Sequence, residues 1–172
     1  MLNWKFNGWA KYKNYRVDNK VNLRIKNHYK GNVISPKYNK KSIVLEGGAI
    51  DVNGKGLLLT TKECLLSKIQ QRNSFLKIKD YNHIFKKFFG VKKVIWLNKG
   101  IVGDDTHGHV DDIARFVKSN KVFIAYENNK KDKKVIKIFK KEFNNRKIIP
   151  IDCSDLIWGF GAIHCLTQQE PK

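Results

Sequence analysis

The chain has 172 residues and a mass of 20.1 kDa, which suits one domain with a hydrophobic core, so we expect a single domain over residues 1–172. Apolar residues make up 41% of the sequence and aromatic residues 12%, a composition that excludes an intrinsically disordered chain. The net charge of +20 comes almost wholly from scattered lysine, whereas a dedicated nucleic-acid interface would cluster arginine, so specific nucleic-acid binding is not predicted.

The first segment with a clear pattern predicts a β-hairpin. Residues 43–52 form a β-type run, Asn53-Gly54 is a favoured hairpin turn, and residues 57–61 form a second β-type run. The first run contains Glu46, which stands directly before two glycines. The hairpin therefore carries a carboxylate in its opening strand.

A helix and another strand are predicted after this hairpin. Apolar residues recur at helical spacing between Ile78 and Phe89, and Gly90 follows where the C-terminus of a helix favours glycine. Residues 94–97 form an apolar run that is typical of a buried strand. The order of elements in this first unit is strand, strand, helix, strand.

The same order of elements is predicted a second time. Residues 110–117 and 122–126 flank a polar turn, residues 135–143 have helical periodicity, and residues 148–151 form another strand-like run. A third unit opens at Gly159. Repetition of one supersecondary unit predicts an α/β fold in which equivalent parts of the units share a common centre.

Chemically versatile residues fall at equivalent positions of these units. Glu46 lies in the opening of the first unit, His109 and Asp111 in that of the second, and Cys165 in that of the third. Each of them alone is most simply a surface or core residue, but two carboxylates, an imidazole and a thiol at one phase of a repeat predict an active site. Alternation along a strand would place His109 and Asp111 on the same face.

The three cysteines, Cys64, Cys153 and Cys165, have no paired spacing, so neither a disulfide framework nor a structural metal site is predicted. Cys64 lies in an apolar run and is expected to be a buried core residue. No stretch approaches the length of a membrane span, and the first ten residues lack the apolar core of an export signal. A reducing cytoplasm is the expected location.

Four motifs resemble, in chain order, those of the agmatine deiminase family: WKFNGW, VLEGGAIDVNGKGLLLTTKECLL, VKKVIWLNKGIVGDDTHGHVDDIARFV and AIHCLTQQEP. This family has the pentein fold, a five-bladed α/β propeller, so the resemblance implies a partial pentein built from strand-strand-helix-strand units. It also implies hydrolysis of agmatine to N-carbamoylputrescine and ammonia, a step of putrescine biosynthesis that uses no metal or organic cofactor.

The resemblance also implies a role for each candidate site residue. Cys165 would be the nucleophile that attacks the guanidinium carbon, and His109 would be the acid/base that protonates the leaving ammonia and then activates water. Glu46 and Asp111 would hold the guanidinium nitrogens. The implied partner is a small guanidino substrate, and a homo-oligomer is left open.

Departures from the family pattern leave alternatives open. Relative to that pattern the chain lacks an N-terminal Arg-Asp-x-Gly-Pro segment and about one internal blade, and Phe160 and Ala162 replace residues of a Gly-Gly-Gly-Asn run before the nucleophile. The first alternative is an inactive remnant or a basic binding protein. The second is a deiminase that acts on peptidyl-arginine or free arginine.

Overall fold

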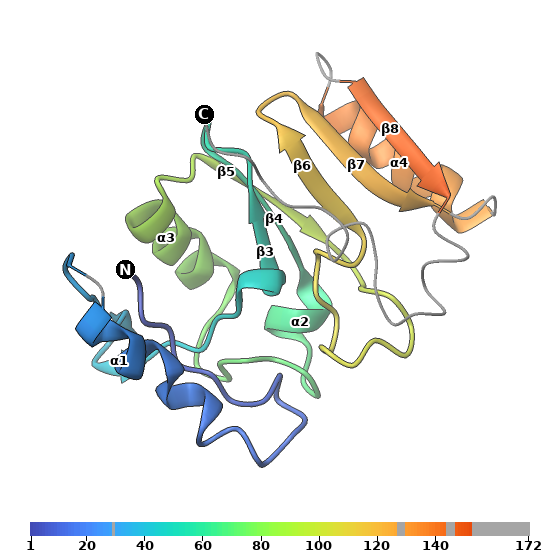
Figure 1. Cartoon of the computed structure of the whole chain (residues 1–172). Helices are drawn as coiled ribbons and strands as arrows, with labels where there is room; N and C mark the ends of the chain where they lie inside the picture. Colours follow the sequence, from blue (N-terminus) through green and yellow to red (C-terminus); the bar gives the residue numbers. More distant parts are fainter. Residues whose placement is uncertain (29, 127–129, 144–146, 153–172) are drawn as a thin grey trace.

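The computed structural model describes residues 1–28, 30–126, 130–143 and 147–152, which form a mixed α/β structure (Figure 1). Two three-stranded sheets lie side by side, and a short N-terminal region packs below the first sheet. The elements of the N-terminal region are η1 (Asp18–Lys20), α1 (Val21–Ile25), η2 (Lys26–His28), β1 (Lys37–Tyr38) and β2 (Lys41–Ser42).

The first sheet has the order β3-β4-β5, with β3 antiparallel and β5 parallel to the central strand. Its elements in chain order are η3 (Gly47–Ala49), β3 (Ile50–Val52), β4 (Leu57–Thr61), α2 (Lys62–Leu66), α3 (Ile78–Phe89) and β5 (Lys93–Leu97). The predicted hairpin, helix and strand are therefore confirmed. The short helix α2, which follows β4 directly, was not predicted.

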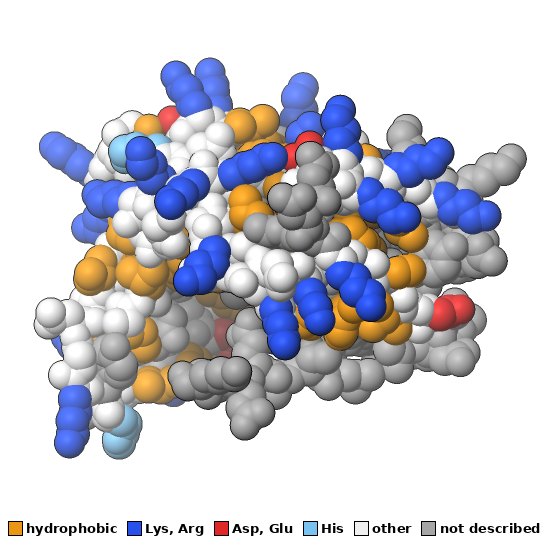
Figure 2. Space-filling model, turned by 90° about the horizontal axis from the view of Figure 1, so that it is seen from above, with side chains coloured by type: hydrophobic (Ala, Val, Ile, Leu, Met, Phe, Trp, Pro, Cys, Tyr) orange, Lys and Arg blue, Asp and Glu red, His pale blue; other side chains and the backbone are white. Residues whose placement is uncertain are grey.

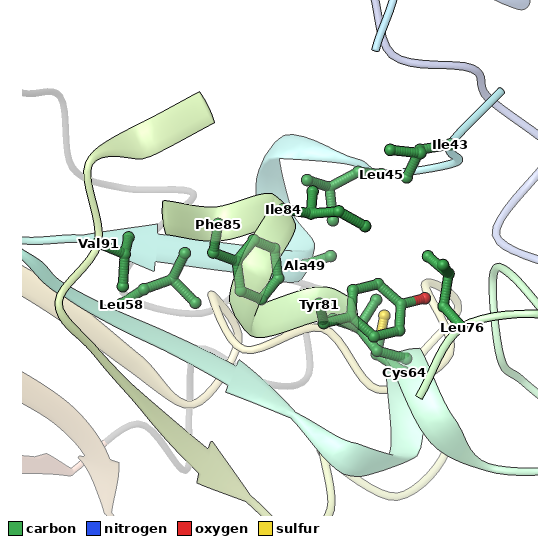
Figure 3. Close-up of a cluster of buried hydrophobic side chains, with 11 residues drawn as sticks. Ile43, Leu45, Ala49, Leu58, Cys64, Leu76, Tyr81, Ile84, Phe85 and Val91 are labelled. Atoms are coloured by element: carbon green, nitrogen blue, oxygen red, sulfur yellow. The ribbon is translucent and has the colours of Figure 1, made fainter. Parts of the chain in front are cut away.

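Helix α3 begins and ends where its sequence signals indicate. The carboxylate of Asp80 accepts the backbone N–H of Lys77 at 2.8 Å, and Gly90 ends the helix in the left-handed region with φ of 64°. Its apolar face packs on the first sheet through Tyr81, Ile84 and Phe85, which are fully buried (Figure 3). Burial of this face fixes the helix against β4.

The second sheet repeats this topology in the order β6-β7-β8, again with one antiparallel and one parallel pair. Its elements are β6 (Ala114–Lys118), β7 (Lys121–Tyr126), α4 (Lys130–Glu142) and β8 (Lys147–Asp152). Two strand-strand-helix-strand units are thus confirmed. The five-bladed arrangement of units stays a prediction, since two of them are described.

Strand alternation divides the apolar residues of the first sheet between two cores. Leu58 joins the core beneath α3, whereas Leu59 joins the core shared with the second sheet and α4. The two sheets are also linked by Asp51 of β3, whose carboxylate accepts the backbone N–H of Phe116 in β6 at 2.5 Å. Packing and this hydrogen bond hold the openings of both units together.

The structure corrects the predicted bounds of the opening strands. Residues 43–46 precede the 3-10 turn η3, and residues 110–113 form turns instead of the start of β6. The backbone N–H groups of Val110 and Asp111 both donate to the carbonyl of Gly48, which holds this segment out of the sheet. Strand alternation therefore does not align His109 with Asp111, contrary to the prediction, although the two side chains do lie close together.

Within the described ranges, no helix is both long enough and apolar enough to cross a membrane. Lys and Arg side chains project across the face shown in Figure 2, with few acidic side chains among them.

Candidate functional site

The imidazole of His109 lies between two carboxylates. Its Nε2 is 3.8 Å from Oε2 of Glu46, and its Nδ1 is 3.7 Å from Oδ1 of Asp111. The His109 side chain is 5% exposed, that of Glu46 7% and that of Asp111 16%, so Asp111 is the most accessible of the three. Residues from the openings of both units therefore meet in one buried cluster.

Arg72 binds the carboxylate oxygen of Glu46 that does not face His109. Its Nε donates to Oε1 of Glu46 at 2.8 Å, and its other guanidinium nitrogens donate to the carbonyls of Gln70 and Thr106. Sequence reasoning missed this residue and counted it only among the arginines, because a buried arginine in a loop has no local signature.

The loop before His109 is shaped by the carboxylate of Asp104. This carboxylate accepts hydrogen bonds from the backbone N–H groups of Thr106, Gly108 and His109 and from the hydroxyl of Thr106. His107 and Gly108 both have positive φ, 60° and 87°, so the chain turns sharply before the imidazole. Asp104 thereby satisfies N–H groups that no strand partner pairs.

Gly48 gives the site the space that it needs. A Cβ atom at this position would lie 2.5 Å from Nδ1 of His109 and would also collide with Oδ2 of Asp111. The EGG motif is therefore explained by close packing of His109 and Asp111 against the backbone that follows Glu46. Gly47, the other glycine of the motif, has nothing within 4 Å of the same position.

Burial and neighbouring charges set the protonation of the carboxylates. Burial raises the pKa of Glu46, but His109 and Arg72 together outweigh it and leave the pKa lowered, so this side chain is ionised. Burial, with Asp111 and Asp104 nearby, raises the pKa of Asp112 to about 6. Glu46 thus faces His109 as a carboxylate.

Cys64 is fully buried at the edge of this cluster. It belongs to the core under α3, beside Tyr81, as predicted (Figure 3). Burial raises the pKa of its thiol to about 12, so it is no ready nucleophile. Its sulfur, a carboxylate oxygen of Glu46 and a ring nitrogen of His109 all lie within 4.8 Å of one another, a grouping that could hold a metal ion.

Three of the four predicted site residues, Glu46, His109 and Asp111, are brought together by the structure. The predicted nucleophile Cys165 lies outside the described residues, as do Phe160 and Ala162. That the sulfur of Cys165 lies close to His109 therefore stays a prediction.

Comparison with known proteins gives the cluster its context. The sequence model of the Porphyromonas-type peptidyl-arginine deiminase family matches residues 1–134 and 122–171. The agmatine deiminase of Medicago truncatula is 37% identical over 137 residues, which cover 76% of this chain and 35% of the relative. That of Pseudomonas syringae pv. tomato is 32% identical over 136 residues, with the same two shares covered.

A solved structure agrees with these sequence matches. The agmatine deiminase of Enterococcus faecalis, whose structure is described as catalysing its reaction, superposes with a TM-score of 0.72 at 27% identity. The match covers 88% of this chain and 44% of that one. The matched residues span about a third of the length of these two agmatine deiminases. Since the family model matches nearly all of its residues, the chain belongs to the Porphyromonas-type peptidyl-arginine deiminase family.

Proposed function

We propose that this protein contributes to agmatine deiminase-type hydrolysis of a guanidino group. The observation that carries the proposal is the His109 imidazole, held between the carboxylates of Glu46 and Asp111 at 3.8 and 3.7 Å. An imidazole between two carboxylates can take up and release a proton, which deimination requires twice. Relatives named agmatine deiminase support the same reaction.

In the proposed reaction, agmatine and water give N-carbamoylputrescine and ammonia. The thiolate of Cys165 attacks the guanidinium carbon, His109 donates a proton to the leaving nitrogen, and a covalent thiouronium remains with release of ammonia. Water then attacks this carbon while His109 accepts its proton. The carbon–sulfur bond breaks, the carbamoyl product leaves, and the thiolate is restored.

The described contacts favour different roles for the two carboxylates. Glu46 is occupied by Arg72 through one oxygen and faces His109 with the other, so we assign it to holding the imidazolium in place. Asp111 is more exposed and is the better group to grip a guanidinium nitrogen. The family resemblance, in contrast, implies that both carboxylates hold the substrate.

The acidic residues around His109 could attract a cationic substrate in spite of the positive net charge of the chain. A chain of net charge +20 repels a dicationic substrate at long range. Within a Debye length, about 8 Å at physiological ionic strength, local charges decide the field instead. Around His109, Asp104 and Asp111 supply negative charge at that range in addition to the Glu46 carboxylate, which is paired with Arg72.

The test is an assay of ammonia release and N-carbamoylputrescine formation from agmatine, run beside free arginine and a peptidyl-arginine substrate. We expect turnover of agmatine, with loss of turnover in Cys165→Ala and His109→Asn and retained folding by circular dichroism. Preference for another guanidine would correct the substrate. Absence of product from all three substrates would overturn the proposal.

A second candidate function is binding of polyanions, which the lysine-covered face in Figure 2 favours. It predicts an affinity for nucleic acid that falls steeply with salt, in proportion to the number of phosphates neutralised. A salt-independent affinity would exclude this function.

A further inference from the structure

We propose that Glu46, Cys64 and His109 form a binding site for a thiophilic divalent cation such as Zn²⁺ or Cd²⁺. The ligand atoms come from three separate segments and lie within 4.8 Å of one another. A carboxylate oxygen, a thiolate sulfur and an imidazole nitrogen are the three donor types that zinc accepts. Because these residues are far apart in sequence, the spacing of the ligands does not predict the site.

Two of the donor atoms face each other without a hydrogen bond. Oε2 of Glu46 and Nε2 of His109 are both buried and, among the described residues, neither makes a hydrogen bond. Their separation of 3.8 Å is too long for a hydrogen bond. The nitrogen and oxygen ligands of a tetrahedral zinc ion lie about 3.3 Å apart, so a shift of about half an ångström would bring them into range.

Each of these ligands is already oriented by an outer group. Arg72 donates to Oε1 of Glu46, which turns Oε2 toward His109. Oδ1 of Asp111 lies 3.7 Å from Nδ1 of His109, on the side where a metal-bound histidine donates to an outer carboxylate, and a small shift would form that hydrogen bond. The backbone N–H of Cys64 is capped by the hydroxyl of Thr61, which fixes the start of α2.

The charges of the cluster balance when the ion is bound. Binding displaces the proton of Cys64 to solvent and forms a metal–sulfur bond, without any oxidation or reduction. The two charges of the ion then meet the Cys64 thiolate and the Glu46 carboxylate. With Arg72 and Asp111 counted as well, these side chains change from one net negative charge to neutral, because a dication enters and one proton leaves.

The donor set also selects among cations. Sulfur and nitrogen ligands suit Zn²⁺ and Cd²⁺, whereas Mg²⁺ requires oxygen ligands in an octahedron. A bound ion would occupy Nε2 of His109 and keep it from proton transfer. Zinc should therefore inhibit deimination, and this consequence rests on the proposed function. The binding of the ion does not depend on that function.

The test is a titration of the full-length Cys165→Ser chain with Cd²⁺, without substrate, followed by the thiolate-to-cadmium absorption band. Cys165→Ser removes the other thiol that the proposed function places near His109. We expect one Cd²⁺ per chain, displaced by Zn²⁺ and unaffected by excess Mg²⁺. Adding Cys64→Ala should abolish the band, and adding Cys153→Ala, the matched control, should leave it unchanged.

Glu46→Gln provides a check that keeps every thiol. In the Cys165→Ser chain this variant should weaken Cd²⁺ binding by at least about tenfold, as loss of a ligand or of its support does. A band that survives Cys64→Ala, or an affinity unchanged by Glu46→Gln, would overturn the site. Since no turnover is measured, an inactive chain would leave this outcome untouched.

Discussion

Arg72 and Glu46 form a buried ion pair, with Nε of the guanidinium 2.8 Å from Oε1 of the carboxylate. The same guanidinium donates to the carbonyl of Thr106, in the loop that leads to His109. One side chain therefore joins the opening of the first unit to the loop of the second. The pair fixes the position from which Glu46 faces the imidazole.

Replacement of Arg72 by Leu should cost about 3–5 kcal/mol of unfolding free energy, because it leaves the Glu46 charge buried without its partner. Urea denaturation measures this loss. Arg16→Leu, at an exposed position, should change stability by no more than about 0.5 kcal/mol. Equal effects of the two substitutions would contradict a structural role for the buried pair.

Gly48→Ala should damage the site, whereas Gly47→Ala should not. The added methyl group at Gly48 collides with His109 and Asp111, and overpacking of this kind costs about 1–3 kcal/mol. Displacement of His109 should lower kcat/KM for agmatine on the order of a hundredfold. At Gly47 the added methyl group meets open space. Comparison of the stability and kcat/KM of the two variants therefore separates the effect of the collision at Gly48 from the general effect of replacing a glycine.

Asp111→Asn should weaken use of agmatine, because it removes a charge-assisted hydrogen bond worth about 1.5–3 kcal/mol. The expected fall in kcat/KM is about 10- to 150-fold. Asp18→Asn removes the same charge from an exposed position in η1 and serves as the matched control. Similar kinetics for both variants would show that net charge, and not Asp111, governs the substrate.

Asp51 should make stability fall as the pH rises. Burial raises its pKa from 3.8 to about 6, so its folded form binds more protons than its unfolded form between these values. The carboxyl is most compatible with the fold below pH 3.8, and this advantage is lost as pH rises through about 6. The penalty at neutral pH is about 3 kcal/mol.

Unfolding of Asp51→Asn at several pH values tests this sign. From about pH 4 to about pH 7, the stability of the variant relative to the original chain should rise by about 2.5 kcal/mol. The matched control is Asp105→Asn, since hydrogen bonds from Lys11 and Tyr12 lower the pKa of exposed Asp105. A constant difference between Asp51→Asn and the original chain would show that Asp51 ionises normally.

Local pattern determined the elements that local physics controls. Local sequence is enough to predict three features: the hairpin turn at Asn53-Gly54, the apolar face of α3 and its end at Gly90. They depend on the spacing of apolar side chains and on the conformational freedom of glycine, and both are properties of neighbouring residues in the sequence. The motifs that carry Glu46, His109 and Asp111 also indicate the candidate site from the sequence alone.

Only the tertiary structure decided how those residues meet. Residues 110–113 leave the predicted strand because their N–H groups find the carbonyl of Gly48 and the turn around Val110, contacts that no sequence period encodes. Arg72 and Cys64 join the cluster from other segments of the chain. Such contacts depend on long-range packing, because charge pairing and burial exist only once distant segments have been brought together.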